Sequence, residues 1–309
     1  MNKQTKKILL IFITTWILAC TESKTSKNSE TNSILSTMND GYIHAKSLNG
    51  NSLKVFDLSD LNKTTDVKAI DIGIENIQYI PLERRNDCLV AYIGKIAADD
   101  NSFYISSVYD IKRFDSKGKF ITKIGQRGRG PTEYPLINDF SISFDSNVYV
   151  LSRDLKKIFV YSNNDEFIKT IPAPNQVSDL CCYNDEIVCY STDIDGAIDN
   201  SFQIIDYDGK IKKQIPNRYK FHDRIRYRRG QMISFCENSK GIFIKEQLSD
   251  TIFKLSGMNL NPKYVIVRGG KLITRGLLSK VVSGPPLEIP QANYIVDLRT
   301  IILEDYIYL

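Results

Sequence analysis

Histidine is scarce in this chain of 309 residues, and the short motifs that mark common catalytic sites are missing. The two histidines, His44 and His222, lie far apart in the sequence. No Cys-x-x-Cys, His-Glu-x-x-His or Gly-x-Ser-x-Gly spacing occurs, so the usual signatures of zinc sites and serine hydrolases are excluded. From the sequence we therefore assign no catalytic residue, no metal site and no cofactor.

The N-terminal apolar run is too short to cross a membrane. It extends from Ile8 to Leu18, which is 11 residues, and it follows Lys3, Lys6 and Lys7. A membrane-spanning helix needs about 20 apolar residues. A basic start followed by a short apolar run is instead typical of a signal peptide.

The run ends in Ile17-Leu18-Ala19-Cys20, which resembles the lipobox of bacterial lipoproteins. The resemblance implies cleavage after residue 19 and a lipid on Cys20. It also implies an outer-membrane protein in the cell envelope that faces either the periplasm or the outside. A plain secretory signal with a chance cysteine is the alternative. Residues 20–40 are dense in Ser, Thr, Asn and Lys, which predicts a flexible tether.

Charge of either sign is not strongly in excess. The chain has 41 basic and 36 acidic residues, and without the three lysines of the signal the balance is 38 to 36, a net charge of +2. Such a balance argues against nucleic acid as a partner.

Cysteine is present in a number that does not suit a disulfide framework. If Cys20 is lipidated, an odd set of five remains, and these cannot all pair: Cys88, Cys181, Cys182, Cys189 and Cys236. A bridge between Cys181 and Cys189 stays open, because both lie near the ends of adjacent predicted strands. Buried free thiols are the favoured interpretation for most of the five.

The chain contains a repeated pattern of four short β-rich runs separated by turn residues. Corresponding second strands begin at Phe103 and Val148, so the period is 148 − 103 = 45 residues. A period of about 40–50 residues with four strands per unit is typical of a β-propeller blade. We predict an all-β fold with four full blades, at residues 93–125, 138–171, 178–215 and 232–267.

The remaining segments predict an incomplete ring of the six-bladed type. A fifth blade begins at residues 294–300 and reaches 306–309, where the sequence stops, so that 93–309 would hold all the blades. The N-terminal segment, residues 41–92, carries a candidate latch strand at Ile77–Glu83 that would complete the last blade. Exposed strand edges leave backbone groups unpaired, so we expect self-association through them.

Part of the chain resembles a known family. Residues 118–134 with the two strands that follow are similar to the NHL repeat. More closely, residues 77–171 resemble the six-bladed β-propeller lipoproteins of Bacteroidetes, whose marks match Ile80-Pro81-Leu82-Glu83, Ile93-Gly94-Lys95-Ile96 and the block from Gly128 to Tyr134. The resemblance implies the fold and an envelope location rather than a chemistry. Some NHL-like enzymes hold an axial metal with several histidines, and two histidines cannot supply that set.

Basic and aromatic residues gather in loops that a propeller places on one face. These are the crossovers between blades and the loops between second and third strands. The candidate ligand-binding residues are Arg127, Arg129, Arg153, Tyr219, Arg224, Arg226, Tyr227, Arg228 and Arg229. Arginine suits planar anionic groups and tyrosine suits sugar faces. Solvated loops that bind nothing are an equally good interpretation.

Two functional hypotheses follow. The first is a lipid-anchored binding or scaffolding module without catalytic activity, whose partner is an anionic glycan or a protein. The second is an envelope lyase or hydrolase of NHL-like propeller type that acts on a glycan or peptide. The Gly-rich stretch Gln126–Gly130 does not favour a phosphate cradle, because strands rather than a helix follow it. We interpret it as a tight crossover in which glycine allows close backbone approach.

Overall fold

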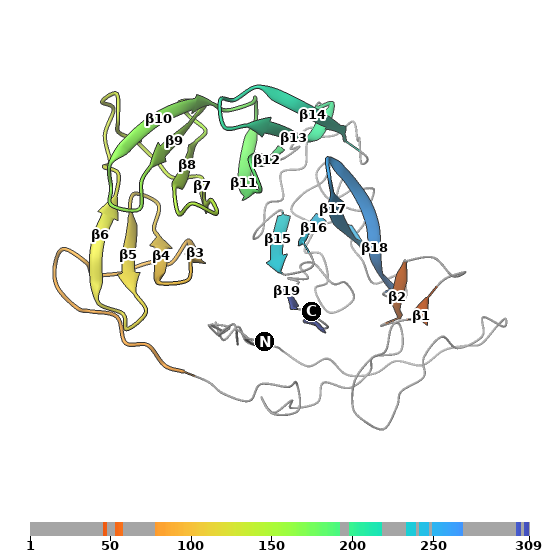
Figure 1. Ribbon diagram of the computed structural model, residues 1–309, viewed down its shortest axis with the longest axis horizontal. Coiled ribbons are helices and arrows are strands. Elements are labelled where there is room, and N and C mark those ends of the chain that lie inside the picture. Colours follow the sequence, from red (N-terminus) through yellow and green to blue (C-terminus); the bar gives the residue numbers. More distant parts are fainter. Residues whose placement is uncertain are drawn as a thin grey trace, which may run out of the picture.

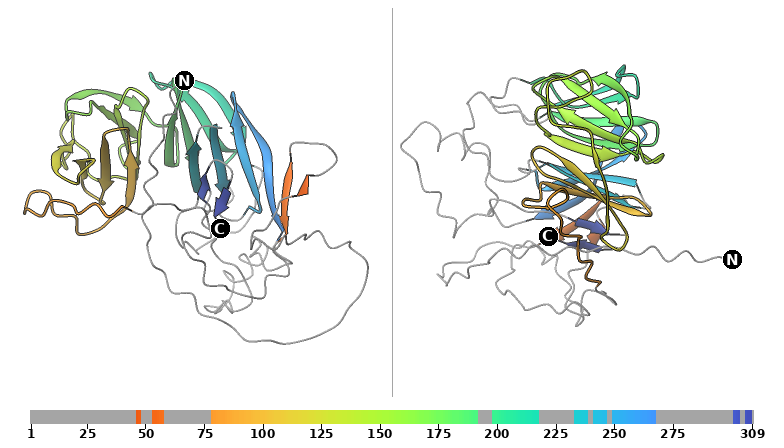
Figure 2. Two further views of the ribbon diagram at one scale, coloured as in Figure 1. Left: turned by 60° about the horizontal axis from the view of Figure 1, so that its bottom comes forward. Right: turned by 90° about the vertical axis from the view of Figure 1, so that its left-hand side faces the viewer.

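The computed structural model describes residues 46–47, 53–57, 78–191, 198–217, 233–238, 241–246, 249–267, 301–303 and 306–308. Every regular element within these ranges is a β-strand. The sheets follow one another round the molecule in chain order (Figure 1), and the turned views show them side by side (Figure 2).

Four sheets correspond to the four predicted blades. Each is a meander of antiparallel strands in sequence order. Blade one contains β3 (Lys95–Ala98), β4 (Ser102–Ser106), β5 (Ile111–Asp115) and β6 (Phe120–Ile124). Blade two contains β7 (Asp139–Ile142), β8 (Val148–Ser152), β9 (Lys157–Tyr161) and β10 (Phe167–Pro172). Blade three contains β11 (Val177–Tyr183), β12 (Glu186–Ser191), β13 (Asn200–Asp206) and β14 (Ile211–Pro216). Blade four contains β15 (Ile233–Asn238), β16 (Gly241–Glu246), β17 (Thr251–Ser256) and β18 (Asn259–Val267).

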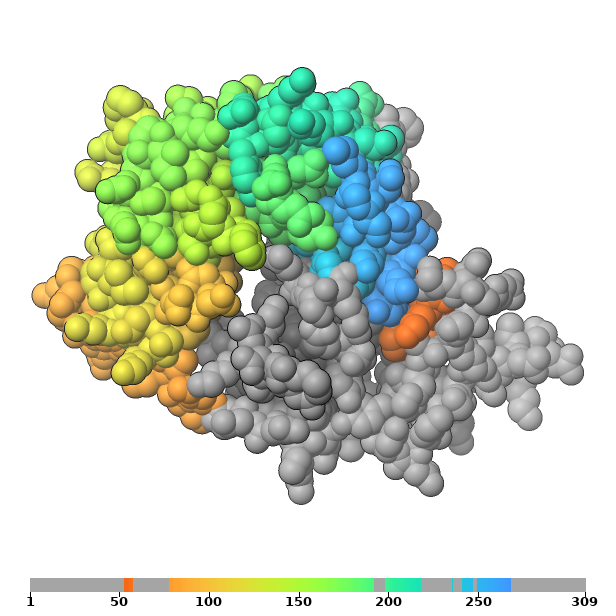
Figure 3. Space-filling view, in the orientation of Figure 1, coloured from red at the N-terminus to blue at the C-terminus, as the bar shows by residue number. Residues whose placement is uncertain are grey.

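This arrangement confirms the all-β propeller class. The strands of the described ranges form an arc rather than a closed ring (Figure 1). In the space-filling view the blades lie against one another in order (Figure 3).

Burial changes from the middle of each blade to its outer strand. All five residues of β8 are buried, because both faces of this strand are covered by neighbouring blades. The outer strands β10 and β14 are largely exposed and carry lysines. Lysine on an outer edge discourages pairing with another chain.

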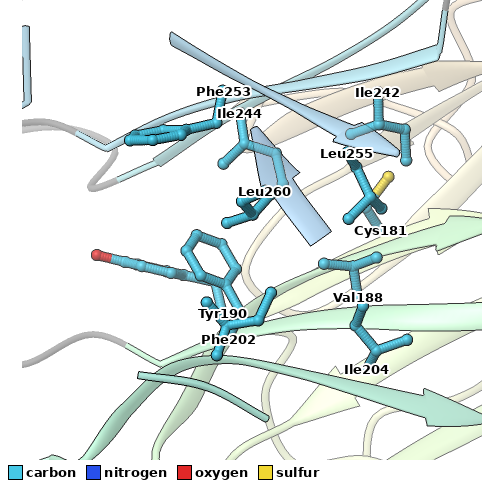
Figure 4. Packing of buried hydrophobic residues seen from close by; sticks show 11 residues of the cluster. Cys181, Val188, Tyr190, Phe202, Ile204, Ile242, Ile244, Phe253, Leu255 and Leu260 are labelled. Carbon is cyan, nitrogen blue, oxygen red and sulfur yellow. The ribbon is translucent and has the colours of Figure 1, made fainter. Parts of the chain in front are cut away.

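The cores lie between the blades. One cluster joins blades one and two and includes Tyr104, Phe140 and Phe159. Another joins blades three and four, where side chains of β11, β12 and β13 meet those of β16, β17 and β18 (Figure 4). Full burial of one such side chain contributes about 1.5–3 kcal/mol, so the blades hold one another in place mainly by apolar contact.

Four cysteines in the described part of the chain are buried and form no disulfide bond. They are Cys88, Cys181, Cys182 and Cys189. The β11–β12 register pairs Leu180 with Cys189 and Cys181 with Val188. Cys181 and Cys189 therefore face opposite sides of the sheet and lie in different clusters, which prevents the bridge that the sequence left open. Burial raises the pKa of Cys189 to about 12, so its thiol stays protonated.

The turns between third and fourth strands repeat along the chain. Asp115 Oδ1 accepts hydrogen bonds from the backbone N–H of Lys117 and Lys119 at 2.8 and 2.9 Å. Gly118 has φ of 82°, a left-handed conformation that favours glycine in this tight turn. The equivalent turn of blade three uses Asp206 in the same way, with Gly209 at φ of 86°.

The expected latch at 77–83 is not formed by the residues that the structure describes. Residues 78–83 belong to no strand, and they run along the last turn of blade one instead. The N–H of Glu83 donates to Gly118 O at 2.8 Å, and its carboxylate accepts from Phe120 N at 2.9 Å. Pro81 has no N–H to give to a ladder, which disfavours a strand that pairs on both sides.

A different N-terminal strand joins the last described blade. β2 (Lys54–Asp57) pairs in parallel with the outer strand β18, and β1 (Lys46–Ser47) pairs with β2. Val55 is buried there, and the ring of Phe56 lies 5.9 Å from that of Tyr264. The N-terminal segment thus extends the sheet of blade four to six strands.

The predicted fifth blade is represented by a two-stranded hairpin. It consists of β19 (Ile301–Leu303) and β20 (Tyr306–Tyr308). Residues 294–300, where this blade was expected to begin, lie outside the described ranges.

Candidate ligand-binding hollow

Three loops at one end of blades one and two surround a hollow of about 370 Å³. They are the β4–β5 loop, the β6–β7 crossover and the β8–β9 loop. The alternation of strand direction puts these three loops at the same end of their sheets. The lining residues are Tyr109, Arg127, Gly128, Arg129, Pro135, Leu136 and Asp154.

The crossover loop is fixed by its own hydrogen bonds. The Glu133 carboxylate accepts from Gly130 N at 2.9 Å, and Gly128 N donates to Tyr134 O at 3.0 Å. A Cβ on Gly128 would lie 1.8 Å from the Glu133 carboxylate. The loop is therefore a close backbone turn round one carboxylate, as the sequence predicted for its glycines.

Two tyrosines attach this loop to the core between the blades. The buried Tyr134 hydroxyl donates to the Ile124 carbonyl at the end of β6. The Tyr161 hydroxyl donates to Thr132 O at 2.6 Å. Burial raises the pKa of both phenols above its usual value, so both stay protonated and keep donating. These hydrogen bonds hold the loop that carries Arg127 and Arg129 in place.

Arg127 and Arg129 carry the positive charge of the hollow. The guanidinium carbon of Arg127 lies 3.9 Å from the centre of the Tyr109 ring, which is a stacking contact. The loop that carries Tyr109 is held by a hydrogen bond from Ile137 N to Val108 O at 2.9 Å. Within the described residues neither guanidinium forms an ion pair. Both are exposed to solvent and available to a ligand.

The nine candidate residues from the sequence divide into two groups. Arg127 and Arg129 line the hollow, and Arg153 lies beside it, next to Asp154 in the β8–β9 loop. The N–H of Arg153 donates to Asn138 Oδ1 at 2.8 Å, which ties this loop to the crossover. The other six lie outside the described ranges, as does Cys20: Tyr219, Arg224, Arg226, Tyr227, Arg228 and Arg229.

Sequence reasoning missed four lining residues, namely Tyr109, Pro135, Leu136 and Asp154. Tyr109 could have been found, because it is an aromatic residue in a loop between a second and a third strand. Asp154 directly follows Arg153 in the equivalent loop of the next blade. Their meeting depends on how two blades pack, and the sequence pattern does not show it.

The described ranges contain no group of three or more His, Cys, Asp or Glu side chains placed to hold a metal ion. In the same ranges no helix has the length and apolar character needed to cross a membrane.

The fold is that of a β-propeller, and the hollow is formed by its loops. Residues 53–289 match the model of the family described as Domain of unknown function (DUF4934), and the chain belongs to that family. No curated protein matches the chain.

Solved structures also resemble this chain. A protein from Bacteroides fragilis that is described as exported superposes with a TM-score of 0.64 and 21% identity, over 80% of this chain and 71% of that one. A member of the duf4221 family from Bacteroides vulgatus gives a TM-score of 0.46 and 15% identity, over 63% of this chain and 62% of that one. The first of these likenesses supports the fold.

Proposed function

We propose that this protein is a lipid-anchored β-propeller of the bacterial cell envelope that binds an anionic ligand through its basic loops, without catalysing a reaction. The observation that carries the proposal is the hollow beside Tyr109, in which Arg127 and Arg129 form no ion pair with any residue that the structure describes. Guanidinium groups bind carboxylate, sulfate and phosphate oxygens with paired hydrogen bonds.

The envelope location is supported by the N-terminal residues. A short apolar run ending in Ala19-Cys20 suits export and lipidation, and residues 20–40 suit a tether. The similar protein from Bacteroides fragilis is described as exported, which agrees with this location. The six-bladed lipoprotein family remains our proposal for the wider relationship.

Retention on an immobilised anionic polysaccharide tests the binding function. We expect the full-length chain to elute at lower salt when Arg127→Gln and Arg129→Gln are combined, because two cations leave the hollow. Salt shortens the screening length from about 10 Å at 0.1 M to about 3 Å at 1 M, so elution reports charge contacts. The matched control is Lys210→Gln with Lys213→Gln, which removes two exposed cations from blade three.

Equal elution of the arginine variant and the lysine control would show that the hollow is not the binding site. Incubation of the wild-type chain with the same polysaccharide gives a second readout. New reducing or unsaturated chain ends would overturn the non-catalytic part of the proposal and favour the lyase or hydrolase.

A further inference from the structure

The hollow contains charges of both signs that do not meet. Asp154 lines it together with Arg127 and Arg129. In the described part of the chain, Asp154 forms no ion pair with either arginine. The nearby Glu133 is engaged inside the crossover by Gly130 N. A ligand that lies between the two sides of the hollow would therefore meet donors on one side and a carboxylate acceptor on the other.

The charge count restricts the ligand. Two arginines and one aspartate give the lining a net charge of 2 − 1 = +1. A ligand with one negative charge brings the site to neutrality. A dianion such as a phosphate monoester leaves an excess negative charge next to Asp154, and a zwitterion leaves the site positive. The neutral part of the ligand must also donate hydrogen bonds, because a carboxylate such as that of Asp154 only accepts them.

The rest of the lining includes apolar and aromatic side chains. Pro135 and Leu136 border the hollow, and Tyr109 is 44% exposed while its ring stacks against Arg127. Aromatic and apolar surfaces of this kind suit the C–H face of a sugar ring. The volume of about 370 Å³ is at the small end of the range for ligand pockets.

We infer that the hollow binds a sugar that carries one carboxylate and free hydroxyls, as in a uronic acid; this rests on the proposed function and names the ligand class for that site. Arg127 and Arg129 bind the carboxylate. Asp154 accepts hydrogen bonds from the hydroxyls, and Tyr109, Pro135 and Leu136 contact the ring.

Calorimetric titration of the full-length chain with three small probes tests the inference. The probes are methyl glucuronide, which is a monoanion, neutral methyl glucoside and dianionic glucose 6-phosphate. We expect the glucuronide to bind tightest. Asp154→Asn should weaken glucuronide binding about tenfold, because a charged acceptor is replaced by a weaker neutral one. The same variant should strengthen glucose 6-phosphate binding about tenfold, because a like charge is removed.

The control variant is Asp185→Asn, which changes an exposed carboxylate in the β11–β12 turn at the other end of the sheets. It should leave both affinities unchanged. Opposite changes for the two anions in Asp154→Asn would support the inference. Changes of the same sign, equal binding of glucoside and glucuronide, or no binding of any probe at millimolar concentration would overturn it. The polysaccharide retention of Arg127→Gln/Arg129→Gln would then decide separately whether the hollow binds another anion.

Discussion

The Nζ atom of Lys95 lies 2.7 Å from Oδ1 of Asp139, and this ion pair joins the inner strands of blades one and two. The other oxygen of Asp139 accepts from Leu180 N at 2.8 Å, on the inner strand of blade three. One carboxylate therefore links three successive blades. Burial acts to lower the pKa of Lys95, but Asp139 outweighs this effect and holds that pKa above its usual value.

Removing this link should destabilise the propeller. We expect Asp139→Ala to lower the free energy of unfolding by about 3 kcal/mol, because Lys95 and Leu180 N each lose a partner. Lys169→Ala, which breaks the exposed pair with Asp208, should cost at most about 1 kcal/mol. Urea unfolding of both variants measures the difference. Equal losses would show that the position of Asp139 among the blades adds nothing.

Gly118 should tolerate no side chain. A Cβ there would lie 2.2 Å from Pro81 O, and its φ of 82° is left-handed. We expect Gly118→Ala to cost about 2 kcal/mol or more and to loosen residues 78–83 from blade one. Gly257→Ala is the control, because its φ is 56° but nothing lies within 4 Å of the added Cβ. It should show the conformational cost alone, about 1 kcal/mol, in the same urea assay. A similar loss in both variants would mean that the contact with Pro81 is unimportant.

The aspartates in the turns between third and fourth strands should have different pKa values in different blades. Backbone N–H groups, first that of Lys119, lower the pKa of Asp115 below its usual value, and Lys210 N does the same for Asp206. In the turn of blade two, burial raises the pKa of Asp165. Carboxyl chemical shifts followed by NMR from pH 2 to pH 7 should give midpoints for Asp115 and Asp206 below that for Asp165.

The sign of the effect on stability follows from the direction of these shifts. A carboxyl with a depressed pKa in the folded state stabilises it above the unfolded-state pKa of about 4 and loses that contribution as pH falls through the folded value. Asp115→Asn should therefore reduce the acid sensitivity of unfolding below about pH 4. If the stability of the variant falls with pH below about 4 as steeply as that of the wild type, Asp115 does not contribute in this way.

The proposed lipidation of Cys20 predicts that replacing this residue changes the location of the protein. Each buried CH₂ of an acyl chain contributes about 0.8 kcal/mol to membrane binding, so several chains anchor a protein firmly. Cys20→Ser should shift the protein from the membrane fraction to the soluble fraction after cell disruption. The wild-type protein serves as control, and a variant that stays in the membrane would rule out the lipobox.

The basic stretch between blades three and four gives a separate prediction. Arg226→Glu, Arg228→Glu and Arg229→Glu together reverse three charges in the sequence-predicted face. We expect weaker, less salt-sensitive retention on anionic polysaccharide than for wild type. If the triple variant elutes like wild type while Arg127→Gln/Arg129→Gln does not, the hollow alone binds the polysaccharide and the three arginines at 226, 228 and 229 do not take part.

Local patterns predicted the blades because each strand pair is close in sequence and each turn carries its own signal, as at Asp115 and Gly118. The pairing of β2 with β18 could not be predicted from local sequence patterns. Tyr264 pairs with Lys54, which lies 264 − 54 = 210 residues earlier, and no turn connects them. For the same reason, the sequence predicted only some of the residues that line the hollow. The positive charges of Arg127 and Arg129 are visible in the sequence. Tyr109 and Asp154 come close to them only because the blades pack together.

The parallel pairing of β2 also sets an order of events on the ribosome. Chains grow at about 5–20 residues per second, so Lys54 emerges roughly 10–40 s before Tyr264. Throughout that interval β2 lacks its parallel partner β18, and its apolar residues Val55 and Phe56 lack that cover. Lys54 and Asp57 flank Val55 and Phe56, and charges in such places act as gatekeepers against wrong pairing. Lys54 and Asp57 thus protect a strand whose parallel partner, β18, is made long after it.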